Sequence, residues 1–255
     1  MKQFIITSSA GKRLIGKAIV ELPVIKSALQ CGTVVIVAGT TNGYVAEEIL
    51  TTLGEKNDFK RGRFFRGITL PPTYKTAETG RLSDESEFPG DVVIKDGAWQ
   101  HGKTIDDVAD ELQEGDIIIK GANALDPVRK RAAVLVGHRQ GGTITVALHS
   151  VVGRRVRLII PVGLEKRIYG DLDDMAKQLN IPGVNGLRLL PVPGEVFTEI
   201  DSLSLLADVT AKLIAAGGVC GAEGSIRLAI SGTTEAEIAA EKILQSVASE
   251  PEFTM

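Results

Sequence analysis

The sequence predicts an α/β protein with a mostly parallel sheet, helices on both faces, and a small C-terminal α/β subdomain. Three apolar runs rich in β-branched residues are typical of strands buried on both faces of a parallel sheet: TVVIVA at 33–38, DIIIK at 116–120 and VRLIIPV at 156–162. Segments with apolar residues at helical spacing alternate with these runs, which predicts right-handed crossovers. The 255 residues, 44% of them hydrophobic, suffice for a large core without disulfides or metals.

The N-terminal part of the chain predicts strands and helices in alternation. In order, these are a strand at 4–6, helices at 14–22 and 24–30, a strand at 33–38 and a helix at 45–53. Pro23 separates the first two helices because proline cannot continue a helix. Gly32 and Gly54 suit the helix C-termini, where the backbone conformation favours glycine.

Residues 55–103 predict an irregular excursion from the main domain. The part up to residue 90 is rich in Lys, Arg, Gly, Pro, Ser and Thr, and loops of this length are often functional or mobile. Order returns with a strand at 91–94 and a hairpin turn at Asp96-Gly97. Thr104 is expected to cap a helix N-terminus, with Asp107 three residues on.

The remaining chain predicts strands at 116–120, 134–136, 156–162, 187–192 and 225–230, and helices at 105–112, 171–179, 203–216 and 233–247. The last of these helices is expected to begin at Thr233 or Thr234, with Glu235 and Glu237 in its first turn. We therefore expect a main α/β domain at 1–186 and a smaller strand-helix-strand-helix subdomain at 187–255.

The composition restricts the partners and the cellular location. The net charge of −3 gives no global reason to expect nucleic acid or membrane binding. Met1 leads directly into a strand rather than a signal peptide, and no run approaches the roughly twenty apolar residues that span a bilayer, so we expect a cytoplasmic protein. The histidines and the cysteines have no metal-ligand spacing, and we expect neither a metal nor a cofactor. We also consider that the protein forms a homo-oligomer.

Three loops at the predicted carboxyl ends of strands are candidate ligand sites, because open parallel sheets bind ligands there. The first is the turn Gly39-Thr40-Thr41-Asn42-Gly43, at the start of a helix. Glycine allows close backbone approach, and free N–H groups at a helix N-terminus bind anions. The alternative is an ordinary strand-to-helix turn in which Thr41 or Asn42 caps the helix. The second loop is GANALD at 121–126, and the third follows residue 162.

The stretch 127–164 contains no Asp or Glu, so its net charge is positive. Its arginines include Arg129, Arg131 and Arg157. Such a segment suits an anionic ligand, and its turn Gly141-Gly142-Thr143 is a second candidate binding element. The alternative is that these arginines are solvated and paired with acids elsewhere in the fold.

Two further motifs have weaker functional interpretations. SSAGK at 8–12 lacks the full pattern of a nucleotide-binding P-loop, and helix capping by Ser8 or Ser9 is the preferred interpretation. KNDFKRGRFFRG at 56–67 interleaves bases with aromatic residues, as single-stranded nucleic-acid sites do. Inward-packed phenylalanines with the bases facing water are the alternative.

Three segments, in this order along the chain, resemble ribose-5-phosphate isomerases, and through them the sugar-phosphate isomerase, glucosamine-phosphate deaminase and CoA-transferase-like group. TVVIVAGTTNGYVAEEIL at 33–50 is similar to their first phosphate-binding turn. DIIIKGANALDP at 116–127 is similar to their strand ending in an acid-rich motif, and VRLIIPVGLEK at 156–166 to the next strand, which leads to a lysine-bearing turn. The resemblance implies an α/β fold and a phosphorylated or similar anionic ligand.

The acidic motif differs from the family at the residues that matter for catalysis. Lys120 and Asn123 stand at the family's first two acids, and only the third is kept, as Asp126. The family's catalytic Glu and Lys lie in the next Gly-rich segment, which here is GHRQGGT, and no carboxylate follows until Glu165. Aldose–ketose isomerisation needs a base beside a carbonyl, so the matching positions do not supply that chemistry.

The sequence leaves the function open between an enzyme and a binding protein. As a divergent isomerase- or transferase-like enzyme, it would hold a small anionic metabolite through the two glycine turns. Lys120 and Asn123 would polarise a carbonyl or phosphate, and Asp126 or Glu47 would move the proton. The second reading is a metabolite-sensing or regulatory domain without catalysis, which the missing carboxylates favour. A third is an RNA-associated protein that uses 56–67.

Overall fold

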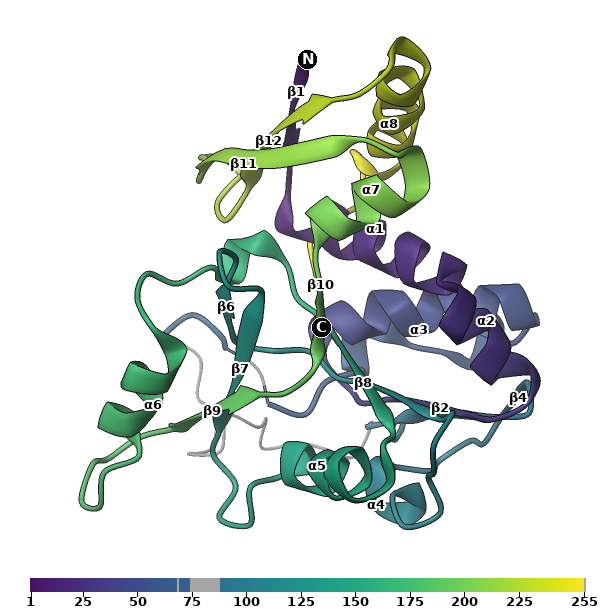
Figure 1. The fold of residues 1–255 in the computed structure, drawn as a ribbon, viewed down its shortest axis with the longest axis vertical. Coiled ribbons are helices and arrows are strands. Elements are labelled where there is room, and N and C mark those ends of the chain that lie inside the picture. Colours follow the sequence, from purple (N-terminus) through teal and green to yellow (C-terminus); the bar gives the residue numbers. More distant parts are fainter. Residues whose placement is uncertain (68, 74–87, 255) are drawn as a thin grey trace.

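The computed structural model describes residues 1–67, 69–73 and 88–254, and shows a mixed α/β fold. Its largest sheet has the order β10-β8-β5-β2-β3-β4 (Figure 1). The strands of this sheet are β2 (Thr33–Ile36), β3 (Val92–Lys95), β4 (Ala98–Trp99), β5 (Ile117–Ile119), β8 (Arg157–Pro161) and β10 (Glu195–Phe197).

Only one side of the large sheet is parallel. β10, β8, β5 and β2 run parallel to one another, whereas β3 pairs antiparallel with β2 and with β4. The other described sheets are antiparallel. The predicted mixed α/β class is confirmed, but a mostly parallel sheet with helices on both faces is not. Hairpins such as the one at Asp96-Gly97 add antiparallel edge strands that the long apolar runs do not reveal.

Two smaller sheets join segments that lie far apart in the sequence. In the first, β1 (Lys2–Ile6) pairs with β12 (Ile226–Ser231), which also pairs with β11 (Thr210–Ala216). In the second, β7 (Arg131–Val136) lies between β6 (Ala124–Asp126) and β9 (Arg188–Val192). Figure 1 shows the first sheet at the top beside α8 and the second at the left beside α6.

The helices follow the strands closely in sequence. They are α1 (Ser8–Glu21), α2 (Pro23–Gln30), α3 (Thr40–Leu53), α4 (Ile105–Val108), α5 (Thr143–Arg154), α6 (Leu172–Leu179), α7 (Glu199–Ala207) and α8 (Thr234–Val247), with short 3-10 turns η1 (Lys56–Asp58), η2 (Arg61–Arg63) and η3 (Leu164–Lys166). No helix among the described residues is long and apolar enough to cross a membrane.

The hydrophobic core is divided into separate clusters, because successive side chains of a buried strand point in opposite directions. Val35 of β2 packs in a cluster with Ile105 and Ala147, from α4 and α5. Its neighbours Val34 and Ile36 pack in another cluster that holds side chains of α1, α2 and α3. β2 is buried along its whole length, as its apolar sequence predicts.

Several local predictions are confirmed. Thr104 and Asp107 form a reciprocal capping box, and Thr233 caps α8 by accepting from the N–H of Ala236. Gly54 ends α3 in the left-handed conformation at φ 76°. Pro23 begins α2 directly after α1, so it separates two helices.

The predicted helix at 203–216 is wrong. α7 ends at Ala207, and β11 follows and pairs with β12. Asp208 adopts the left-handed conformation at φ 53°, which stops the helix. The chain then continues with Val209 and Thr210, β-branched residues that favour a strand once a pairing partner is present.

The proposed division at residue 187 stays a prediction, and strand pairing crosses it. β9 and β10 lie after residue 187 but pair with β7 and β8, which lie before it. β1 from the N-terminus pairs with β12 near the C-terminus. In the excursion at 55–103, the described residues form η1, η2 and the β3-β4 hairpin, and residues 68 and 74–87 lie outside the described part.

Candidate functional site at the carboxyl edge of the parallel strands

The turn at 39–43 leads from β2 into α3, as predicted. Gly39 occupies the N-terminal capping position, and no side chain of the described residues caps α3. Capping by Thr41 or Asn42 is therefore not what the structure shows, since both residues lie inside the helix. Because the first-turn N–H groups have no side-chain acceptor in the described part of the chain, this helix end keeps the partial positive charge that attracts anions.

Two buried polar side chains of this turn are only partly satisfied. Asn42 is fully buried, and its Nδ2 donates to the carbonyls of Val37 at 2.6 Å and Ile119 at 3.0 Å, which joins the ends of β2 and β5. Its Oδ1 and the hydroxyl of Thr41 are buried without a hydrogen-bond partner among the described residues. Buried polar atoms rarely stay unpaired, so both favour a polar ligand or water beside the turn.

Lys120 lies directly after β5, in the middle of the parallel strands. Its N–H donates to the carbonyl of Ile159 at 3.0 Å, which extends the pairing of β5 with β8. The side chain is half-buried, and its ammonium group forms no hydrogen bond or ion pair within the described part of the chain. An unpaired cation at the carboxyl edge of a parallel sheet is a binding group for an anion.

The carboxylate of Asp91 lies close enough to act on Lys120 but is held by other donors. Its Oδ1 accepts from the N–H of Ala38 at 2.8 Å. Its Oδ2 accepts from the N–H of Ile105 at 2.8 Å and from Arg66 at 2.9 Å. With these three hydrogen bonds in place, Asp91 fixes the loops around β2 and α4 and forms no ion pair with Lys120.

Burial lowers the pKa of Lys120 to about 8. The negative charge of Asp91 opposes this shift in the pKa, whereas the positive charges of Arg66 and Lys166 add to it. Burial disfavours the charged form of this amine. The unfavourable energy is relieved either when an anion binds to the ammonium group or when the group loses its proton. Lys120 is therefore more easily deprotonated than an exposed lysine.

A second lysine reaches the same edge from the next strand. Lys166 lies in η3 after β8, and its Nζ donates to the carbonyl of Ala122 at 2.7 Å. Burial lowers the pKa of Lys166, and the negative charge of Glu165 opposes the change. Since the charge of Lys166 also lowers the pKa of Lys120, the ends of β5 and β8 bring two amines within electrostatic range of each other.

A buried carboxyl group and a partly buried one adjoin Lys166. Glu199 begins α7 after β10, is 1% exposed, and accepts from the N–H of Leu164 at 2.9 Å. Glu165 has a buried Oε1 without a hydrogen-bond partner. Burial, and after it the negative charge of Glu165, raise the pKa of Glu199 to about 8. Glu199 therefore holds a proton at neutral pH beside an ionisable neighbour.

Two glycines allow these carboxyl groups to approach the backbone closely. A Cβ at Gly163 would lie 1.8 Å from Oε2 of Glu165, and one at Gly11 would lie 2.6 Å from Oε1 of Glu199. Lys12 follows Gly11 in α1, and its positive charge acts on both Glu199 and Lys166. The SSAGK segment, predicted to be a plain helix start, therefore contributes a cation here. Ser8 lies inside α1, and the capping side chain is that of Thr7.

Asn123 and Asp126, predicted beside Lys120, have structural partners. Asn123 accepts from the N–H of Leu135 at 2.9 Å and so joins β6 to β7. Asp126 accepts from the N–H groups of Val128 and Arg129, both at 3.0 Å. These hydrogen bonds, that from Arg129 first, lower the pKa of Asp126. The interactions explain both residues without a ligand, and their roles in a site stay predictions.

The turn Gly141-Gly142-Thr143 leads into α5, with Gly141 at φ 85° and Gly142 at φ 66°. The carbonyl of Gly142 accepts from the N–H of Thr145 at 3.1 Å. No hydrogen bond between described residues joins this turn to the turn at 39–43. Its participation in the same site stays a prediction.

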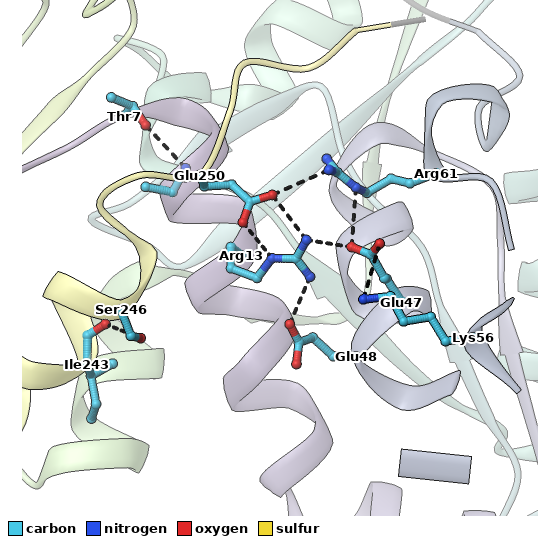
Figure 2. Close-up of polar contacts among 10 residues, drawn as sticks. Thr7, Arg13, Glu47, Glu48, Lys56, Arg61, Ile243, Ser246 and Glu250 are labelled. Carbon is cyan, nitrogen blue, oxygen red and sulfur yellow. Dashed lines mark hydrogen bonds and ion pairs between the residues drawn. The ribbon is translucent and has the colours of Figure 1, made fainter. Parts of the chain in front are cut away.

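Glu47, considered as a proton carrier, belongs to a separate ionic network that Figure 2 shows. Arg13 binds Glu47 at 2.5 Å, Glu48 at 2.8 Å and Glu250 at 2.9 Å. Arg61 also contacts Glu47 and Glu250, both at 3.3 Å. Hydrogen bonds from Arg13 hold the pKa of Glu47 below its usual value, although burial alone would raise it. The network attaches the C-terminal tail to α1 and α3.

A cavity of about 460 Å³ lies beside this network and is lined by Arg61, Gly62, Pro251, Glu252 and Thr254. None of the lysines or carboxyl groups at the strand ends lines it. We therefore place the candidate site at the strand ends and not in this cavity, because the partly buried amines and the unpaired polar atoms lie at the strand ends.

The arginines of the acid-free stretch are mostly paired. Arg131 binds Asp173 at 2.5 Å, and Arg157 binds Glu195 at 2.6 Å. Arg129 contacts Asp126 and Asp171, and Lys130 contacts Asp201. The acids that neutralise the stretch come from β6, α6 and its capping residue, β10 and α7, so the alternative of paired arginines holds for these residues.

The aromatic residues of 56–67 pack inward rather than presenting rings to solvent. Phe64 is fully buried and lies edge-on to Phe59 with centroids 5.0 Å apart. The guanidinium of Arg61 lies 3.9 Å from the ring centre of Tyr44. These described rings are not available for base stacking, which removes the feature that suggested RNA.

Comparisons of the chain with family models, with curated proteins and with solved structures found no match. Among the described residues, no group of His, Cys, Asp and Glu side chains could hold a metal ion. The interpretation of the candidate site therefore rests on the geometry of its residues.

The sequence indicated part of this site and missed the rest. Lys120 was predicted from its place after an apolar strand, and the turn containing Lys166 was noted as lysine-bearing. Glu199 was missed because β10 is only three residues long and its apolar signal is short. Glu165 was noted only as the first carboxylate after the acid-free stretch.

Proposed function

We propose that this protein binds a small phosphorylated or carboxylated metabolite at the carboxyl ends of β2, β5 and β8. The observation that carries the proposal is Lys120, a half-buried cation without a counterion among the described residues. Lys166 supplies a second positive charge from the adjoining strand end. Two cations at one edge attract an anion, and partial burial weakens the competition from water.

The uncapped start of α3 supports the same ligand class. Its N-terminus adds a partial positive charge near the end of β2. The unpaired hydroxyl of Thr41 can donate a hydrogen bond to an anionic oxygen, and Asn42 fixes this turn to the end of β5. Lys120 and Lys166 are therefore assigned to charge recognition, and the turn at 39–43 to hydrogen bonding.

The carboxyl pair favours an enzyme over a purely sensing domain. Glu165 and Glu199 lie in the environment that general acid–base residues use, where burial and a neighbouring carboxylate keep one group protonated. A sensing domain has no need for such a pair. We propose that these two side chains, rather than Asp126 or Glu47, move protons on the bound metabolite.

Ligand binding is tested by thermal unfolding and calorimetry with inorganic phosphate, glycerol 3-phosphate, ribose 5-phosphate and pyruvate. A ligand at a hundredfold excess over its dissociation constant adds about 2.7 kcal/mol to the stability of the folded state. We expect Lys120→Met and Lys166→Met to weaken binding at least about tenfold, since each removes one charge–charge hydrogen bond.

Lys177→Met is the matched control, because Lys177 is exposed and pairs with Asp174 of its own helix. Binding that persists unchanged in both the Lys120 and Lys166 variants would place the anion elsewhere and contradict the proposal. Chemical conversion of ribose 5-phosphate or pyruvate, followed by NMR, separates the enzyme from the sensing domain. Binding with complete recovery of the ligand would favour the sensing alternative for those compounds.

A further inference from the structure

We propose that Lys120 is a nucleophilic amine that forms a Schiff base with the carbonyl group of the anionic metabolite. The inference rests on the proposed function, because it takes the same edge of the sheet as the binding site. It adds the substrate class, which is an aldehyde or ketone that also carries a phosphate or carboxylate.

The position of Lys120 suits this chemistry. Its backbone is fixed between β2 and β8 by the hydrogen bonds at the end of β5, so only the side chain moves. The amine is free of hydrogen bonds and ion pairs with described residues, so no partner must be broken before attack. Asp91, the carboxylate that acts on it, is occupied by Arg66 and two backbone N–H groups.

The surroundings also favour the neutral, reactive form of the amine. A lysine that is desolvated and placed near another cation loses its proton more easily, which activates it as a nucleophile. Here the neighbouring cations are Lys166 and Arg66, and burial is the larger cause of the lowered pKa. Lys166 differs because its amine already donates to the carbonyl of Ala122. Lys120 is therefore the attacking amine. Its ammonium form attracts the anion, and after losing its proton the amine attacks the carbonyl while Lys166 holds the anionic group.

The step balances without any further reactant. The lone pair of the neutral amine forms a C–N bond to the carbonyl carbon, and the carbonyl electron pair moves to oxygen, which takes up the proton that the nitrogen loses. A second proton, from Glu199, is added to the hydroxyl group as the C–O bond of the carbinolamine breaks, so that water leaves and a protonated imine remains. The Glu165–Glu199 pair adjoins Lys166, whose charge acts on Lys120, and we assign the proton exchange of these steps to that pair.

The test is reductive trapping on the full chain. The protein is incubated with dihydroxyacetone phosphate or pyruvate, reduced with sodium cyanoborohydride, digested and analysed by mass spectrometry. Hydride reduces the imine to a stable secondary amine, so the peptide containing Lys120 gains the mass of the reduced adduct. At pH 7.5 we expect this peptide to react about tenfold or more faster than exposed lysines, because a larger fraction of the amine is neutral.

Lys120→Arg keeps the positive charge but removes the nucleophile, and Lys177→Arg is the matched control on an exposed helix. The proposal expects the dominant adduct to disappear in the first variant and to remain in the second. Labelling of Lys120 should rise with pH around 8, well below the range of exposed lysines. Uniform labelling of surface lysines, or a dominant adduct on Lys166, would overturn the proposal.

Glycerol 3-phosphate separates this proposal from the proposed function, because it has the phosphate without a carbonyl group. If it binds at the lysine edge while no carbonyl compound forms an adduct, the Schiff base is wrong and anion binding stands. If neither glycerol 3-phosphate nor a carbonyl compound binds, both proposals fail. Competition of glycerol 3-phosphate against adduct formation would support both.

Discussion

Arg66 binds the buried carboxylate of Asp91 at 2.9 Å, and this ion pair leaves Lys120 without a counterion among the described residues. Asp91 also accepts backbone N–H groups on two sides, from Ala38 and Ile105. One carboxylate therefore fixes two loops at the edge of the sheet, and the unpaired lysine beside it is a consequence of that arrangement.

Asp91→Ala is expected to destabilise the fold by about 3 kcal/mol or more, because it removes a buried acceptor from Arg66 and from two backbone N–H groups. The free energy of unfolding is measured in urea. Asp110→Ala is the control, since Asp110 is exposed and should change stability by less than about 0.5 kcal/mol. Equal effects of the two variants would contradict the structural role of Asp91.

The stability of the protein should rise with pH through the titration of Lys120. Its folded pKa of about 8 lies below the usual 10.5, so the unfolded chain binds more protons between these values. Stability therefore increases from pH 8 to 10.5, by about 3 kcal/mol for the full shift. Lys120→Met removes this contribution. We measure the difference in unfolding free energy between wild type and variant across this pH range.

That difference isolates Lys120 because the charged neighbours Asp91, Arg66 and Lys166 are present in both proteins. Lys120→Met should be the more stable protein at pH 7, where wild type holds a buried ammonium. A difference that does not vary with pH would show that Lys120 titrates like an exposed lysine.

Glu199 gives the opposite pH dependence. Its folded pKa of about 8 lies above the usual 4.5, so the folded protein binds the extra proton between these values. Its contribution to stability is fully present below pH 4.5 and is lost as the pH rises toward 8 and beyond. Glu199→Gln mimics the protonated carboxyl and should remove a fall of about 1 kcal/mol or more between pH 5 and 8.

Differential unfolding of wild type and the Glu199 variant measures this contribution, with Glu235→Gln as a control on an exposed side chain. Glu165 remains in every protein, so the comparison reports the group that carries the proton. If wild type and the Glu199 variant change in parallel with pH, Glu199 is ionised at neutral pH and the proton-carrying pair is wrong.

Arg13→Met is expected to cost about 3 kcal/mol, because three carboxylates lose their shared partner (Figure 2). Glu250→Gln removes the charge of only one member and should cost less, about 1 kcal/mol. The second variant should also release the C-terminal tail, measured as faster cleavage after Glu252 by a glutamate-specific protease while the core stays intact. A tail equally protected in both proteins would contradict its attachment through Arg13 and Arg61.

Local sequence patterns predicted many of the elements but not their partners. The capping box at Thr104 and the cap at Thr233 were predictable, because each involves residues a few positions apart. The strand at β11 was not, since its pairing with β12 outweighs an apolar pattern that also fits a helix. Likewise the short β10, which positions Glu199, depends on β8 for its hydrogen bonds.

By itself, the sequence determined the mixed α/β class, the strand that ends at Lys120 and the turn at 39–43 before α3. Only the tertiary structure decided which charges meet there. Asp91 takes Arg66 and leaves Lys120 unpaired, and Glu165 meets Glu199 across two different strand ends. The physical reason is that apolar periodicity and caps act over a few residues, whereas burial and pairing of charges depend on the packing of distant segments.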